Sequence, residues 1–187
     1  MITKRLSDFS QIELLYHTRM EKDFSSNELR PLESLRDAWV RNAYECYGLF
    51  DENRIEGYAF FFRRGQDYLL DFFAIAPEHR DEGLGSVFLR QLMKLVKQAD
   101  SLICEVEDPD AAQNGEDKKQ RERRMSFYLR NGCRKTSLTS ILFGVNYCIL
   151  EMPLGREHTV DELRRIYAGL YYSMLPERIF RTELQIG

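Results

Sequence analysis

The segment from Leu69 to Lys97 holds the residues best suited, by type and spacing, to bind a phosphate group. Residues 69–76 are rich in Leu, Phe and Ile and predict a buried strand, which Pro77 ends. Gly83 and Gly85 then open an apolar pattern of helical spacing at Leu84, Phe88 and Leu92. Glycines at the start of a helix let a ligand approach the unpaired N–H groups and the positive end of the helix dipole. Such an arrangement suits a phosphate.

A second interpretation of these glycines is a tight turn followed by a helix cap. The sequence contains no Gly-x-x-x-x-Gly-Lys-Ser/Thr pattern and no Gly-x-Gly-x-x-Gly after a strand, so two common phosphate-binding motifs are excluded. The candidate that remains is the hexapeptide Arg80-Asp81-Glu82-Gly83-Leu84-Gly85.

The elements before this segment are helices and a set of antiparallel strands. Asp8 or Ser10 caps a first predicted helix, and a second covers about Leu32–Tyr44. Turn residues separate the predicted strands, which therefore form hairpins. These strands are 2–6, Cys46–Glu52, Ile55–Arg64 and Tyr68–Ala76.

The elements after the glycine-opened helix begin with a short strand at Leu102–Glu107. Because a helix connects it to Tyr68–Ala76, a right-handed crossover would make the two strands parallel. The remaining predictions are a loop at Ala111–Lys119, a helix at Arg121–Asn131, a strand at Tyr147–Leu154 and a helix capped by Thr159.

Length and composition predict one globular domain spanning residues 1–187, with a C-terminal helical appendage at residues 155–187. The chain has 187 residues, of which 43% are hydrophobic. Its formal net charge of −3 argues against a nucleic-acid partner, which would require a basic face. No apolar run approaches the roughly 20 residues of a membrane span, so no membrane partner is expected. The appendage either packs on the domain or forms a dimer contact, so a monomer and a homodimer both remain open.

The four cysteines are far apart in the sequence, form no Cys-x-x-Cys pair and have no nearby histidines. A structural metal site is therefore not expected. The first residues contain no apolar signal segment. We expect a cytoplasmic protein with reduced thiols.

The hexapeptide Arg80–Gly85 resembles the Arg/Gln-x-x-Gly-x-Gly/Ala signature of the GCN5-related N-acetyltransferase (GNAT) superfamily. A second segment, Phe127-Tyr128-Leu129-Arg130-Asn131-Gly132-Cys133, is similar to the Phe-Tyr-x-x-x-Gly-Phe motif of the same family. Here Cys133 replaces the usual aromatic residue, and Arg121 and Arg124 replace the Asn and Ala of many relatives. The resemblance implies an α/β (α+β) fold with a mixed central sheet of about six to seven strands flanked by helices. It also implies a V-shaped splay between the fourth and fifth strands, where the pantetheine arm of CoA lies.

The resemblance implies acetyl-CoA as the co-substrate and gives its binding residues. The phosphates would lie on the signature and the start of its helix, formed by Arg80, Asp81, Glu82, Gly83, Leu84, Gly85 and Ser86. A backbone N–H of Phe73, Ala74 or Ile75 would polarise the thioester carbonyl. Arg124 is a further candidate for a phosphate contact.

Proton transfer requires a base for the acceptor amine, whose pKa in water is about 10.4, and an acid for the departing thiolate. Tyr128 matches the tyrosine that serves as the acid in the family. The carboxylates available as the base are Asp71 and Glu105 together, followed by Glu107. Asp71 lies in an apolar run, where a charge without a partner is costly, while Glu105 and Glu107 alternate with Val106 and are expected on one face. Solvated or paired strand carboxylates, and an aromatic core tyrosine, remain the alternatives.

The function that the resemblance implies is transfer of an acetyl group to a primary amine, by direct attack in a ternary complex. The acceptor is expected to be a small-molecule amine or a peptide amine, and the sequence does not identify it. The alternative function is a catalytically silent CoA-binding module that acts as a sensor or interaction partner.

Overall fold

The computed structural model describes all residues, Met1–Gly187, and the chain divides into two compact units. Unit 1 comprises Met1–Arg63 and Asp71–Val96, and unit 2 comprises Arg64–Leu70 and Lys97–Gly187. The strand β4 (Asp67–Ile75) therefore contributes its first residues to unit 2 and the others to unit 1. A single domain over the whole chain stays a prediction.

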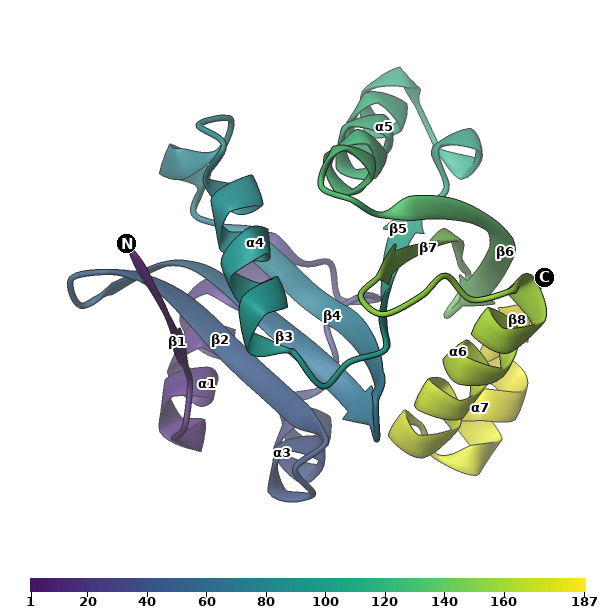
Figure 1. The fold of residues 1–187 in the computed structure, drawn as a ribbon, viewed down its shortest axis with the longest axis horizontal. Coiled ribbons are helices and arrows are strands. Elements are labelled where there is room, and N and C mark those ends of the chain that lie inside the picture. Colours follow the sequence, from purple (N-terminus) through teal and green to yellow (C-terminus); the bar gives the residue numbers. More distant parts are fainter. The chain divides into compact units, whose positions relative to one another are not determined.

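Unit 1 consists of antiparallel strands covered by helices on both faces. Its strands are β1 (Ile2–Arg5), β2 (Tyr44–Asp51), β3 (Arg54–Arg64) and the end of β4. Its helices are α1 (Phe9–Leu15), a π-helical turn (Tyr16–Met20), α2 (Glu21–Asp23), α3 (Leu32–Val40) and α4 (Leu84–Leu95). Helix α4 covers one face of the strands, and α1 and α3 cover the other (Figure 1).

The core of unit 1 is aromatic. Phe60, Phe61 and Phe62 of β3 are fully buried, so this strand is covered on both of its faces. The register of β2 and β3 runs from Tyr44 opposite Phe62 to Asp51 opposite Arg54. Helix α3 ends at Val40, earlier than expected, because Asn42 adopts a positive φ of 56° and the chain turns into β2.

Unit 2 contains the parallel strand pair that the sequence predicts. The first residues of β4 pair in parallel with β5 (Ser101–Glu107), from Asp67 opposite Ser101 to Leu70 opposite Cys104. The other strands, β6 (Arg134–Leu142), β7 (Val145–Pro153) and β8 (Leu184–Ile186), are antiparallel to their neighbours. The helices are α5 (Gly115–Arg130), α6 (Val160–Met174) and α7 (Glu177–Glu183).

The eight strands form one mixed sheet, which confirms the expected fold class. The strand order is β1-β2-β3-β4 in unit 1 and β4-β5-β7-β6-β8 in unit 2. The sheet has one strand more than the six to seven expected, and β6 and β8 are the two strands that the sequence analysis did not assign. Helix α5 also begins at Gly115, inside the segment 111–119 that the sequence analysis assigns to a loop. The side chain of Asn114 caps it by accepting hydrogen bonds from the N–H groups of Glu116 and Asp117.

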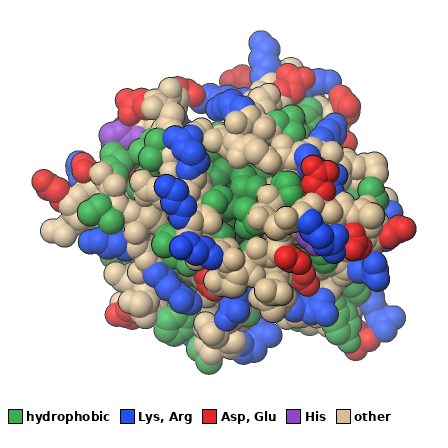
Figure 2. Space-filling model, viewed as in Figure 1, with side chains coloured by type: hydrophobic (Ala, Val, Ile, Leu, Met, Phe, Trp, Pro, Cys, Tyr) green, Lys and Arg blue, Asp and Glu red, His purple; other side chains and the backbone are tan.

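The molecular surface carries both signs of charge. On the face drawn in Figure 2, Lys and Arg side chains lie among Asp and Glu side chains rather than in one basic field. No helix combines the length and apolar character needed to cross a membrane.

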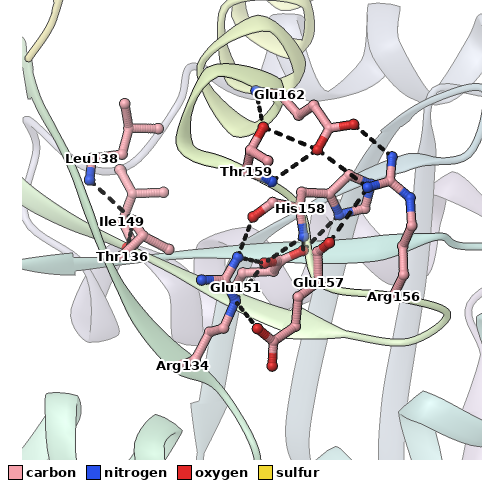
Figure 3. A network of polar contacts seen from close by, with 10 residues as sticks. All are labelled: Arg134, Thr136, Leu138, Ile149, Glu151, Arg156, Glu157, His158, Thr159 and Glu162. Atoms are coloured by element: carbon pink, nitrogen blue, oxygen red, sulfur yellow. Dashed lines mark hydrogen bonds and ion pairs between the residues drawn. The ribbon is translucent and has the colours of Figure 1, made fainter.

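A buried polar network fixes the start of α6 to the sheet of unit 2 (Figure 3). Glu151 of β7 is fully buried, and Arg134 lies directly opposite it on β6. The carboxylate of Glu151 accepts hydrogen bonds from Arg134 Nε at 2.8 Å and from the Nδ1 and the backbone N–H of His158, at 2.7 and 3.3 Å. The next residue, Thr159, caps α6 in a reciprocal pair with Glu162. The position of α6 therefore depends on Glu151.

Replacing Glu151 with Gln should lower the free energy of unfolding by about 3 kcal/mol, because Arg134 and His158 would lose their buried anionic partner. The measurement is urea unfolding at neutral pH. Glu157→Gln is the matched control: Glu157 is 3.7 Å from the same arginine, but its side chain is 70% exposed, so its loss should cost less than about 0.5 kcal/mol. Equal effects of the two substitutions would show that the buried network does not hold α6.

Candidate active site

The turn after β4 has the geometry that the glycine signature predicts. A short 3₁₀ turn, Pro77–His79, follows the strand, and α4 begins at Leu84. Asp81 and Gly83 both adopt left-handed backbone conformations, with φ of 70° and 78°. Left-handed residues in a turn direct successive N–H groups toward one side and form a concave site for anions. Because a Cβ atom at Gly83 would meet nothing within 4 Å, its backbone conformation, and not lack of space, favours glycine there.

Arg80 joins this turn to the end of β4. Its Nε donates to the carbonyl oxygen of Ile75 at 3.1 Å, and a terminal nitrogen is 3.1 Å from a carboxylate oxygen of Asp23. The side chain is half exposed. Since a guanidinium carries five N–H donors, these two contacts leave Arg80 with donors for a phosphate.

The backbone at Phe73–Ile75 is held against α4. The Phe73 ring stacks on Phe88 of α4, with centroids 5.6 Å apart and an angle of 24° between the planes. Ile75 is buried. The strand end, the turn and the start of α4 are thus parts of one packed assembly in unit 1, and they contain every predicted CoA-binding residue except Arg124.

Asp71 forms an ion pair inside unit 1. Arg30 donates to it from Nε at 3.0 Å and from a terminal nitrogen at 2.9 Å, and the Tyr44 hydroxyl also donates to it. Both members of the ion pair are largely buried. Burial, and then the charge of Asp71, raise the pKa of Tyr44 well above its usual value, so this hydroxyl keeps its proton. The buried carboxylate at Asp71 therefore has a cationic partner.

Glu105 of β5 meets two neutral donors in unit 2. The hydroxyl of Tyr171 lies 2.8 Å from each of its carboxylate oxygens, and the hydroxyl of Tyr167 donates to one of them. Both tyrosines belong to α6 and are fully buried, whereas Glu105 is partly exposed.

Glu107, the last residue of β5, has a different set of partners. Arg121 and Arg124 of α5 lie 3.1 and 2.7 Å from its carboxylate oxygens. Glu105 and Glu107 were expected on one face of β5, yet they contact different helices. Glu105 is hydrogen-bonded to α6, and Glu107 forms ion pairs with α5. Arg124, predicted to contact CoA, is half exposed and lies in this ion pair.

Tyr128 lies near the C-terminal end of α5, beside Cys104 of β5 and Cys133. Burial, followed by the nearby thiols of Cys104 and Cys133, raises its pKa well above the usual value for tyrosine. The two sulfur atoms are 4.0 Å apart, so Cys104 points toward the end of α5. Adjacent residues of a strand point to opposite faces, so Glu105 and the Cys104–Tyr128 cluster occupy opposite faces of β5.

The predicted site residues thus fall into two groups. Asp71, Phe73–Ile75 and Arg80–Ser86 belong to unit 1, and Glu105, Tyr128 and Arg124 belong to unit 2. Sequence reasoning did not anticipate the partners of the carboxylates. Tyr167 and Tyr171 carry one local signal, since their spacing of four places them on one face of a helix. Arg30 and Tyr44 carry none.

No group of three or more His, Cys, Asp and Glu side chains is arranged to hold a metal ion.

Comparisons with known proteins identify the family and the fold. The model of the acetyltransferase (GNAT) family matches residues 10–115, more than half of the chain. A GNAT-family protein from Bacteroides thetaiotaomicron is 20% identical, with a TM-score of 0.73 over 91% of this chain and 96% of its own. No curated protein sequence matches the chain.

Two further solved structures share the fold. A GNAT-family acetyltransferase from Elizabethkingia anophelis with acetyl-CoA bound is 15% identical, with a TM-score of 0.57 over 82% of this chain and 97% of its own. An aminoglycoside 6′-N-acetyltransferase complexed with coenzyme A is 14% identical, with a TM-score of 0.61 over 85% and 100%. These likenesses show the fold, and the family model shows the family. The chain belongs to the GNAT family of acetyltransferases.

Proposed function

We propose that this protein transfers an acetyl group from acetyl-CoA to a primary amine. The observation that carries the proposal is the junction of β4 with α4, where a left-handed Asp81 and Gly83 precede the N-terminus of a twelve-residue helix. That junction presents backbone N–H groups to the phosphates of CoA. Arg80 supplies positive charge beside it, and the backbone at Phe73–Ile75 supplies an N–H for the thioester oxygen.

The partners of the three carboxylates favour Glu105 as the base. Arginine stabilises the ionised form of a carboxylate and so weakens it as a proton acceptor, which applies to Asp71 and Glu107. Within unit 2, Glu105 is instead held by two neutral hydroxyls. Asp71 then has a structural role, joining Arg30 to β4.

Tyr128 is suited to be the acid because its raised pKa keeps the phenol protonated throughout the neutral range. The acceptor ammonium loses one proton to Glu105, and the neutral amine attacks the thioester carbon. The nitrogen loses a second proton to water as the adduct collapses and the C–S bond breaks. Tyr128 gives one proton to the sulfur and is protonated again from solvent, while Glu105 releases its proton to solvent, so a single proton is released overall.

The acceptor is an amine whose identity the site does not specify. Solved structures of this fold include an aminoglycoside 6′-N-acetyltransferase and a spermidine N-acetyltransferase chimera, which justify testing an aminoglycoside, a polyamine and a peptide with a free N-terminus. The four cysteines are free thiols, which supports a reducing, cytoplasmic setting.

Gly83→Glu should abolish acetyl-CoA and CoA binding, because a carboxylate at the mouth of α4 would repel the phosphates. The measurement is titration calorimetry with both ligands. Gly144→Glu is the matched control: Gly144 has a φ of 77°, has equally open surroundings and lies in the β6–β7 turn, so the backbone strain is the same. The proposal is supported if the wild type and Gly144→Glu bind both ligands and Gly83→Glu binds neither. A wild type that binds neither ligand would contradict the proposed function.

Glu105→Gln should lower kcat/KM for the acceptor by about 100-fold, because the amide cannot accept the proton. Asp71→Asn should instead lower the free energy of unfolding by about 3 kcal/mol, since it leaves Arg30 without its buried partner, and should affect turnover less. Steady-state rates and urea unfolding on both variants separate the two roles. If Asp71→Asn is as stable as the wild type but inactive, Asp71 and not Glu105 is the base.

Tyr128→Phe should lower kcat by about 100-fold and leave acetyl-CoA binding unchanged. The acid acts in its protonated form, and its pKa is raised above 10, so loss of the Tyr128 proton should produce no fall in wild-type rate up to about pH 9. Tyr172→Phe, an exposed position on α6, is the control. Full activity of the Tyr128 variant would remove the acid assignment.

A further inference from the structure

The α6 residues Tyr167 and Tyr171 form a hydrogen-bonded cluster with Glu105 of β5 and Ser140 of β6. Tyr171 lies 2.8 Å from both carboxylate oxygens, Tyr167 donates to one of them, and Ser140 Oγ is 2.8 Å from the Tyr167 hydroxyl. Apart from Glu105, every member of the cluster is buried. The cluster therefore joins three elements of unit 2 at one carboxylate.

The direction of the hydrogen bonds follows from the donors available. An ionised carboxylate only accepts, so each tyrosine hydroxyl donates its single proton to Glu105. Ser140 must then donate to the oxygen of Tyr167. Burial, followed by the charge of Glu105, raises the pKa of Tyr167 well above its usual value, so the phenol keeps its proton. The result is one ionised carboxylate oriented by two neutral phenols.

We propose that Tyr167 and Tyr171 are positioning residues that fix the orientation and the proton affinity of Glu105, which makes the C-terminal helix a working part of the active site. This inference rests on the proposed function. It assigns a role to a helix outside residues 10–115, the part of the chain that the family model matches. The two residues are four apart on α6, and their ring centroids are 4.9 Å apart, so the two rings pack edge to face.

Neutral donors suit this task better than arginine would. The two phenols restrict the rotation of the Glu105 carboxylate, as the guanidinium of Arg30 does for Asp71, and they carry no charge themselves. The position of α6 in turn depends on the buried Glu151 carboxylate, which binds His158, and on the Thr159 cap that follows (Figure 3). The Glu151 network therefore supports α6, and two tyrosines of α6 hold Glu105.

The test uses Tyr167→Phe and Tyr171→Phe, which remove one oxygen each and keep the ring packing. With the amine that the wild type acetylates fastest among the three tested, each variant should lose about 10-fold in kcat/KM. The acidic limb of its pH–rate profile should move to higher pH, because a carboxylate that loses a hydrogen-bond donor is protonated more readily. Acetyl-CoA affinity should not change. Tyr172→Phe, on the exposed side of the same helix, should match the wild type in all three.

A second readout does not depend on turnover. In protein labelled with ¹³C at the glutamate carboxyl groups, the Glu105 signal, assigned by its absence in Glu105→Gln, should titrate at higher pH in Tyr171→Phe than in the wild type. An unchanged midpoint and an unchanged rate profile would overturn the positioning role while acetyl transfer stands. In another outcome, the wild type binds acetyl-CoA but acetylates none of the three amines, and the Glu105 midpoint is shifted in Tyr171→Phe. That result would confirm the hydrogen bond between Tyr171 and Glu105 and overturn its role in catalysis.

Discussion

A carboxylate buried in a sheet requires a partner, and in this protein the partner determines what each carboxylate can do. Asp71, Glu107 and Glu151 lie against arginines, whose positive charge offsets the cost of removing them from water. Glu105 lies against two phenols in unit 2. Asp71, Glu107 and Glu151 are thereby suited to joining elements of the fold, and Glu105 is the carboxylate that we propose exchanges a proton.

The two units position their groups by different means. In unit 1, a turn with two left-handed residues joins β4 to α4, and the stacking of Phe73 on Phe88 holds the strand end to the helix. In unit 2, the helix α6 supplies two hydrogen-bond donors to Glu105. That helix begins at a capping box beside the buried Glu151 network, so a structural network supports the residue that we propose as the base.

The fold class followed from the family resemblance of two short motifs, and local patterns predicted the parallel pairing of β4 with β5 and the turn before α4. They fell short where the signal was weak: β8 has only three residues, and β6 has a break in its register between Lys135 and Thr139. The start of α5 was predicted too late, although Asn114 and the acidic residues after it are a recognisable signal for the start of a helix. The partners of the carboxylates could not be read in this way, because Arg30 and Asp71 are 41 residues apart, and Glu105 and Tyr167 are 62 residues apart. Only the folded chain brings such pairs together.

The most direct test of the account is a crystal structure of the protein with acetyl-CoA bound. The account predicts that the pyrophosphate accepts hydrogen bonds from the backbone between Gly83 and Ser86, and that the Tyr128 hydroxyl lies within hydrogen-bond reach of the thioester sulfur. It also predicts that the Glu105 carboxylate is still held by Tyr167 and Tyr171. A thioester beyond the reach of Tyr128, or phosphates bound away from the β4–α4 turn, would contradict it.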